Sequence, residues 1–186
     1  AMLRRDDVDY VSIKLSAVAS QLSMWGFETT VQRLVDKLTP LYEYAAIQPK
    51  KKFINLDMEE YRDLGLTILV FKKLLAKPEL QNLEAGIVLQ AYLPDAFEAL
   101  KELTQFATER VANGGASIKV RIVKGANLAM EHVDAKWHGW EVSVDRDEKT
   151  GQVVTTVGMP QFPGLDKVLD TAEKMYSFVN SGIPKK

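Results

Sequence analysis

Apolar and polar residues alternate in four short segments of the chain, and each segment is rich in Ile, Val and Leu. The segments are Tyr10 to Ala17, Phe53 to Met58, Gly86 to Leu93 and Ser117 to Lys124. Alternation with a period of two is the pattern of a β-strand whose two faces meet different surroundings. The sequence therefore predicts four strands.

The stretches between these strands place apolar residues three and four positions apart, as amphipathic helices do. They run from Val31 to Tyr42, from Leu64 to Leu75 and from Phe97 to Ala107. Asn113 and Gly114 should close the third helix, whereas Pro40 is expected to bend or split the first. Single helices between successive strands indicate parallel βαβ units, because a tight turn cannot connect parallel strands.

The two faces of the predicted strands differ in character. One face is apolar and is expected to carry the helices, whereas the other collects polar side chains from all four strands. A doubly wound sheet has helices on both faces, but a (βα)₈ barrel tolerates polar side chains near the mouth of its lumen. We therefore expect an α/β fold that is a partial TIM-type barrel, with about four parallel strands and intervening helices.

Four polar or charged side chains fall in the last part of these strands: Lys14, Asp57, Gln90 and Arg121. The carboxyl ends of barrel strands surround one mouth, where active sites lie. We expect the four to converge there, with Asp57 answering the charge of Arg121 or Lys14 and an anionic or polar small molecule as ligand. The alternative is a structural network of ion pairs and hydrogen bonds that fills the barrel end without a ligand.

The composition limits the binding partners and the kinds of metal site that we expect. The net charge is −1, so we expect no broad basic surface for nucleic acid or an anionic membrane. With no cysteine and two histidines, His132 and His138, no thiolate or histidine-rich metal site is expected. With neither a long apolar run nor a signal-like start, we expect a cytoplasmic protein. Trp25, Trp137 and Trp140 are expected to pack rather than to stack on a cofactor.

Four strings, in this order and at this spacing, resemble the proline dehydrogenase domain of bacterial bifunctional proline utilization proteins. They are YVSIKLSA, NLDMEEYRDLGLT, GIVLQAYL and VRIVKGANLAMEHVDA, and the resemblance covers about residues 8 to 140. It implies a distorted (βα)₈ barrel that holds FAD and oxidises L-proline to Δ1-pyrroline-5-carboxylate. The hydride would pass from the ring carbon beside nitrogen to the flavin, which supplies the redox chemistry.

The resemblance also implies roles for individual residues. Arg121 resembles the arginine that hydrogen-bonds the reactive nitrogen of the flavin, and Gln90 resembles the glutamine at its pyrimidine edge. Lys14 resembles the lysine that helps to hold the carboxylate of proline, and Asp57 resembles the aspartate that orders the substrate pocket. Arg121 and Asp57 are thus the expected catalytic residues. The strand-to-helix turn beside the flavin corresponds to Lys124 and Gly125.

The resemblance accounts for four of the eight strands of such a barrel. We therefore predict a truncated barrel over residues 1–140 and a tail over 141–186, which carries the patterns of a hairpin and an amphipathic helix. Two copies would supply eight strands, so a homodimer or larger homo-oligomer through the open sheet edges is expected. Two alternatives to an active dehydrogenase stay open: a remnant that has lost FAD and proline binding, and a small-molecule-binding module.

Overall fold

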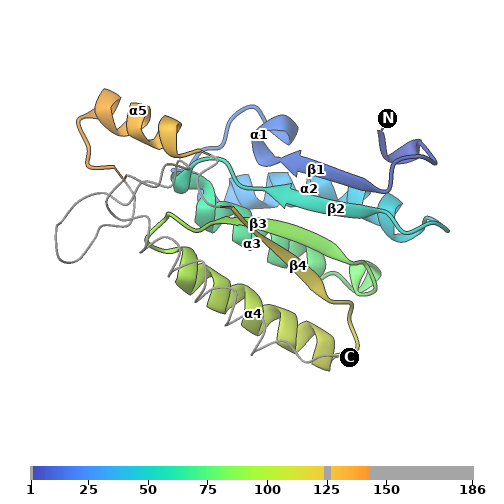
Figure 1. The fold of residues 1–186 in the computed structure, drawn as a ribbon. Coiled ribbons are helices and arrows are strands. Elements are labelled where there is room, and N and C mark those ends of the chain that lie inside the picture. Colours follow the sequence, from blue (N-terminus) through green and yellow to red (C-terminus); the bar gives the residue numbers. More distant parts are fainter. Residues whose placement is uncertain (1, 124–126, 143–186) are drawn as a thin grey trace. The chain divides into compact units, whose positions relative to one another are not determined.

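A four-stranded sheet with the order β1-β2-β3-β4 organises the chain (Figure 1). The computed structural model describes residues 2–123 and 127–142. The strands are β1 (Tyr10–Lys14), β2 (Phe53–Asp57), β3 (Ala85–Gln90) and β4 (Ile118–Val123). The site residues Lys124 and Gly125 lie outside the described residues, and so do the predicted hairpin, apart from its first two positions, and the predicted C-terminal helix.

The strands pair in parallel, as the βαβ pattern predicted. Lys14 at the end of β1 lies opposite Asp57 at the end of β2, and Asn55 of β2 lies opposite Gly86 of β3. β1 and β4 form the two edges, so the sheet is open across the described ranges. The α/β fold with about four parallel strands and intervening helices is thereby confirmed.

The chain also forms five α-helices and three short 3₁₀ helices within residues 2–123 and 127–142. They are η1 (Met2–Arg4), α1 (Leu15–Val18), α2 (Phe27–Ala46), η2 (Tyr61–Asp63), α3 (Leu64–Leu75), η3 (Pro78–Leu80), α4 (Ala96–Ala112) and α5 (Leu128–His138). The first predicted strand is too long, because the chain turns into α1 directly after Lys14. Gly114 follows α4 with a φ of 80°, as the predicted helix end requires.

Pro40 was expected to bend or split the first long helix, and it does not split it. α2 runs without interruption from Phe27 to Ala46. A proline removes the hydrogen bond to the carbonyl four residues earlier, which here belongs to Asp36. Both residues are exposed, so water can serve that carbonyl, while Leu38 and Tyr42 are fully buried on the other side of the same turns. Core packing therefore keeps the helix continuous.

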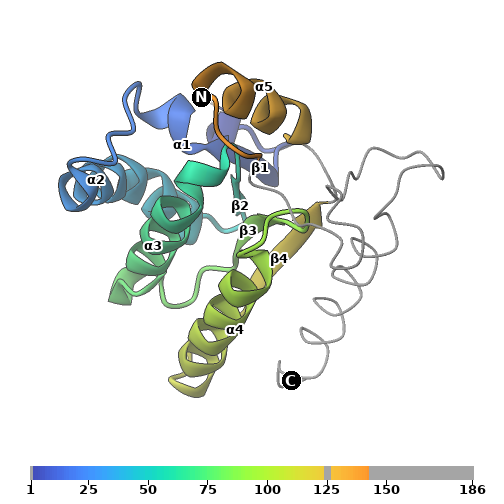
Figure 2. The same ribbon diagram turned by 90° about the vertical axis from the view of Figure 1, so that its left-hand side faces the viewer.

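The chain divides into two compact units, which are described separately. The first comprises residues 1–88 and 106–121, and the second comprises residues 89–105 and the chain from Ile122 onwards. In the first unit α2 and α3 lie on one face of β1, β2 and β3 (Figure 2). The largest fully buried side chains of this unit come from α2, β2, α3, η3 and β3: Leu34, Leu38, Tyr42, Ile54, Leu56, Leu66, Phe71, Leu74, Leu75, Leu80 and Ile87.

In the second unit, α5 has apolar residues on two opposite sides. Leu128 and Ala135 are buried, whereas Met130, Val133 and Trp137 are exposed. No helix in the described part of the chain is long and apolar enough to cross a bilayer.

The expectation that the tryptophans pack is wrong for Trp25 and Trp137, which are fully exposed and 85% exposed. Trp140 is 66% exposed and stacks only on the ring of His138, with 4.3 Å between the ring centroids. Trp25 precedes α2, Trp137 lies near the end of α5 and Trp140 follows α5, and at such positions an indole can remain in water. Alternation or helical spacing alone does not reveal this.

Candidate active site

Arg121 and Asp57 form an ion pair on the face of the sheet that α2 and α3 leave open. Arg121 projects from β4 and Asp57 from the end of β2, and Arg121 Nη2 lies 2.6 Å from Asp57 Oδ1. The Arg121 side chain is 47% exposed and the Asp57 side chain 20% exposed. Arg121 was one of the two cations that Asp57 was expected to pair with, and the geometry bears this pairing out.

Lys14 has a different partner from the one suggested by its register. Although it lies opposite Asp57, its Nζ lies 3.4 Å from Glu59 Oε1. The sequence patterns did not predict Glu59 as a site residue. Its position two residues beyond the end of β2 could have indicated it, because the parallel register continues the line of β2 past the end of β1. The site therefore holds two cations, each with its own carboxylate.

Asn55 adds a buried amide beside this pair. It is 1% exposed, and its Nδ2 donates to Asp57 Oδ1 at 2.9 Å and to Ser12 Oγ at 3.1 Å. Asp57 Oδ1 thus accepts from both Asn55 and Arg121. Within the described residues, no further hydrogen bond is made by Asp57 Oδ2 or by Nε and Nη1 of Arg121. A carboxylate oxygen and several guanidinium N–H groups are therefore available to a ligand.

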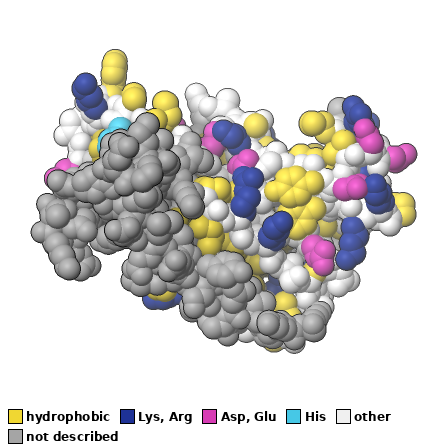
Figure 3. Space-filling view, in the orientation of Figure 1, with side chains coloured by type: hydrophobic (Ala, Val, Ile, Leu, Met, Phe, Trp, Pro, Cys, Tyr) yellow, Lys and Arg dark blue, Asp and Glu magenta, His cyan; other side chains and the backbone are white. Residues whose placement is uncertain are grey.

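The exposed face of the sheet carries mixed charge. Side chains alternate between exposed and half-buried along β1 and β4, and Ser12, Lys14, Lys119 and Arg121 are on the exposed positions. Figure 3 shows this face, with Lys and Arg side chains next to Asp and Glu side chains. The sorting of polar residues onto one face of these strands is as predicted.

Gln90 belongs to the second unit and is 1% exposed there. Tyr92 in the same unit is also buried, and burial, followed by the nearby charge of Glu131, raises the pKa of Tyr92 above its ordinary value. Gln90 is a buried amide, and its approach to Arg121 stays a prediction.

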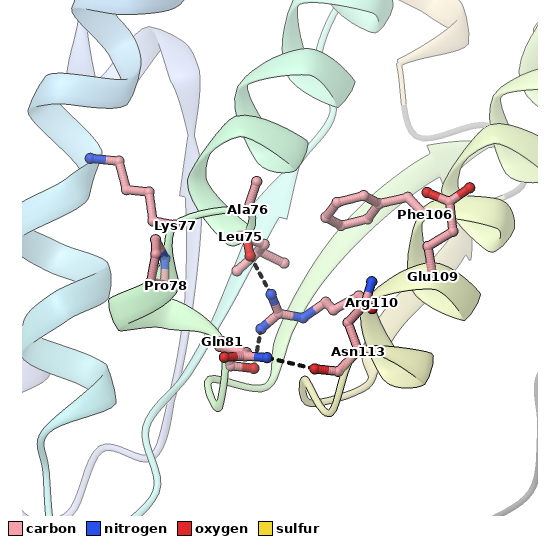
Figure 4. Close-up of a pocket in the computed structure, with 9 residues that line it drawn as sticks. All are labelled: Leu75, Ala76, Lys77, Pro78, Gln81, Phe106, Glu109, Arg110 and Asn113. Carbon is pink, nitrogen blue, oxygen red and sulfur yellow. Dashed lines mark hydrogen bonds between the residues drawn. The ribbon is translucent and has the colours of Figure 1, made fainter.

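A cavity of about 330 Å³ lies away from this site, beside η3 and the last turns of α4 (Figure 4). Arg110 lines it and is 8% exposed. Its guanidinium donates to five backbone carbonyl oxygens, those of Leu75, Leu80, Gln81, Leu83 and Ala116. Burial lowers the pKa of Arg110. With its donors engaged by the backbone, this side chain joins the chain segments that precede β3 and β4 and is a structural group.

No three carboxylate or histidine side chains gather as a metal ion would require anywhere in residues 2–123 and 127–142.

Comparison with known proteins gives a consistent answer. A family model described as proline dehydrogenase matches residues 2–153. Proline utilization A (PutA) from Corynebacterium freiburgense is 52% identical with a TM-score of 0.75, over 79% of this chain and 15% of that one. PutA from Bdellovibrio bacteriovorus, in a form inactivated by N-propargylglycine, is 41% identical with a TM-score of 0.64, over 72% of this chain and 14% of that one.

More distant PutA structures agree in fold. A PutA variant from Bradyrhizobium japonicum is 26% identical with a TM-score of 0.65, and covers 75% of this chain and 14% of its own. No curated protein matches the chain. The chain thus spans about one seventh of the length of these solved relatives. Because the family model covers most of the sequence, and the relative at 52% identity covers 79% of it, the chain belongs to the proline dehydrogenase family.

Proposed function

We propose that this chain takes part in the FAD-dependent oxidation of L-proline to Δ1-pyrroline-5-carboxylate. The observation that carries the proposal is the Arg121–Asp57 ion pair, at 2.6 Å, at the carboxyl end of a parallel sheet in a member of the proline dehydrogenase family. The sequence alone predicts both as site residues, and barrel enzymes carry their catalytic residues at this end of their strands.

The residues at the sheet face have a donor set that fits a flavin. Arg121 offers N–H groups that make no bond within the described residues, and its half-exposed side chain leaves them open to a bound ring. The nitrogen and carbonyl edge of an isoalloxazine accepts such donors. When bound, FAD supplies the acceptor for the hydride of proline. The role of Arg121 is to hold a fixed positive charge against the edge of the ring where electron density increases.

Lys14 suits the carboxylate of proline. Its side chain is 57% exposed and its Nζ lies 3.4 Å from Glu59, a separation longer than that of a tight charge-assisted hydrogen bond. An exposed ion pair of this kind contributes little stability, so exchange of Glu59 for a substrate carboxylate is inexpensive. Asp57 then orients the Arg121 guanidinium and keeps one carboxylate oxygen for the substrate side.

Titration of the full 186-residue chain with FAD tests the proposal. We expect bound-flavin absorbance, and reduction of an acceptor dye on addition of L-proline. Arg121→Met should weaken FAD binding about tenfold or more, the equivalent of one strong polar contact. Lys14→Met should raise the KM for proline while FAD binding stays unchanged. The matched control is Arg5→Met, which removes another exposed Arg–Asp pair of 2.6 Å and should change neither quantity.

A chain that stays colourless in excess FAD would refute the proposal. A chain that binds FAD but gives no proline-dependent dye reduction would refute the oxidation and leave flavin binding standing.

We also propose that two copies associate through the open edges of their sheets in the cytoplasm. β1 and β4 are unpaired edges within the described residues, and such edges attract a further strand unless something covers them. Light scattering coupled to size-exclusion chromatography should give twice the chain mass or more at micromolar concentration, and a stable monomer would refute the association.

A further inference from the structure

Asn55 occupies a buried position where an apolar residue would cost less desolvation free energy. It sits in the middle of β2 between two buried residues, Ile54 and Leu56, and is itself 1% exposed. Burying an amide costs free energy unless its hydrogen-bonding groups are satisfied. Both N–H donors of its NH₂ group are satisfied, one by Ser12 Oγ and one by Asp57 Oδ1, whereas its buried Oδ1 accepts no hydrogen bond within the described residues.

The orientation of the amide follows from its neighbours. The NH₂ side faces two oxygen acceptors, so the reverse orientation would set the amide oxygen against the Asp57 carboxylate. The Oδ1 side faces Gly86 of β3. A Cβ at position 86 would lie 2.7 Å from Asn55 Oδ1 and 2.9 Å from the Phe53 ring, which is too close for either. The absence of a side chain on Gly86 therefore makes the room in which the amide lies.

The amide and the guanidinium converge on one carboxylate oxygen. Asn55 Nδ2 lies 2.9 Å and Arg121 Nη2 lies 2.6 Å from the same Asp57 Oδ1. Rotating the carboxylate away from Arg121 would also break its bond to a buried donor, which would then be left unsatisfied. The buried amide thus restrains the rotation of the half-buried carboxylate, and through it the exposed cation.

We propose that Asn55 is a positioning residue for the Asp57–Arg121 pair: it holds Asp57 with Oδ1 toward Arg121 and leaves Oδ2 open to the ligand. The proposal deepens the flavin-dependent function above and rests on it for its catalytic meaning. Asn55 itself touches neither proline nor FAD in this scheme. It sets the direction in which the charge of Arg121 points.

The first experiment needs no flavin. In the full chain, Arg121→Met changes an exposed side chain and is expected to fold. Because Arg121 and Asn55 share an acceptor, this variant should shift the side-chain amide resonances of Asn55 in ¹H–¹⁵N spectra, whereas Arg5→Met should leave them in place. An Asn55 amide that does not respond to loss of Arg121 overturns the proposal.

A double-mutant cycle gives the second readout. Asn55→Leu removes both donors at similar volume, and its effect on unfolding should differ between the native background and the Arg121→Met background. Shifts in the unfolding midpoint that simply add would show independent residues and would overturn the proposal. If Asn55→Leu does not fold, the spectra of the Arg121→Met chain still decide.

FAD affinity then connects the network to function. Asn55→Leu should raise the dissociation constant for FAD about tenfold, with little further effect in the Arg121→Met background. Ser12→Ala, which removes only the other acceptor of the same amide, should change it less than threefold. A core variant of matched thermal stability, such as Leu38→Val, should leave it unchanged, and an equal loss in that variant would overturn the positioning role. If the unaltered chain binds no FAD, the proposed function fails. The spectra and the double-mutant cycle still test whether Asn55 positions the Asp57–Arg121 pair.

Discussion

Replacing Arg110 by methionine tests whether a buried cation that has no carboxylate partner within the described residues stabilises this fold. Arg110 lies near the end of α4, and all five of its acceptors are backbone carbonyl oxygens. Methionine has a similar length and an apolar side chain, so it retains most of the packing and removes the donors. Burial lowers the pKa of Arg110, because loss of solvent disfavours the charged form. The fold therefore retains the residue for its hydrogen bonds.

The size of the effect follows from the acceptors. The carbonyls of Leu80 and Gln81 each keep a second donor, the N–H of Leu83 at 3.0 Å and of Ala116 at 2.8 Å. The loss therefore falls mainly on the other three carbonyls. A buried carbonyl left without a donor costs about 1–3 kcal/mol. Because the adjoining cavity allows water to reach these carbonyls, we use about 1 kcal/mol for each of them. We expect a loss of about 3 kcal/mol in the free energy of unfolding.

Urea denaturation followed by far-ultraviolet circular dichroism measures this loss. The Arg110→Met midpoint should fall with little change in slope, and Arg110→Lys should lose more than half as much, because an ammonium group cannot span carbonyls supplied by three segments. Arg5→Met should leave the midpoint almost unchanged, since the side chain of that arginine is 65% exposed. A loss below about 1 kcal/mol for Arg110→Met would refute the reasoning, because it would mean that water replaces the guanidinium at every carbonyl.

Three further substitutions should each change the stability of the fold in a definite direction. Burial raises the pKa of Tyr42, so the stability that its neutral hydroxyl confers is complete below about pH 10 and is lost as the pH rises further. Tyr42→Phe should therefore unfold at a higher pH than the native chain, and an unchanged midpoint of alkaline unfolding would contradict this. Pro40→Ala restores a helix hydrogen bond at an exposed position and should stabilise the chain by about 1–3 kcal/mol, measured by urea denaturation; a destabilised variant would show that the proline is needed. Lys52→Met removes a 5% exposed ammonium that donates to the backbone carbonyls of Arg5 and Val8, and should lower the thermal midpoint and speed proteolysis before β1; unchanged cleavage would count against this.

The strands were predictable because their signal is local. Alternation in Tyr10–Lys14 and Ile118–Val123 records which side of the sheet each residue faces, and the observed burial in β1 and β4 follows it. The end of β1 was not predictable in this way. The letters from Leu15 to Val18 suit either a strand or a helical turn, and the turn forms where the chain leaves the sheet.

The site was predictable in part for a related reason. Lys14, Asp57 and Arg121 stand at strand ends, so βαβ topology alone brings them to one edge of the sheet. Asn55 and Glu59 required knowledge of the register and of which oxygen meets which donor. Arg110 could not be distinguished from a surface charge on an amphipathic helix, because its burial depends on carbonyls from residues about 30 positions earlier in the chain.

The position of the tryptophans determines what intrinsic fluorescence can report for this protein. All three indoles, Trp25, Trp137 and Trp140, are more than half exposed in the folded chain. Their emission should therefore be that of solvated indole before any denaturant is added, and unfolding should move its wavelength very little. A blue shift, in contrast, would mean that a molecule has covered the outer side of α5 or the loop before α2. Tryptophan emission is thus a sensor of surface contacts for this chain, and its folding has to be followed by the peptide backbone.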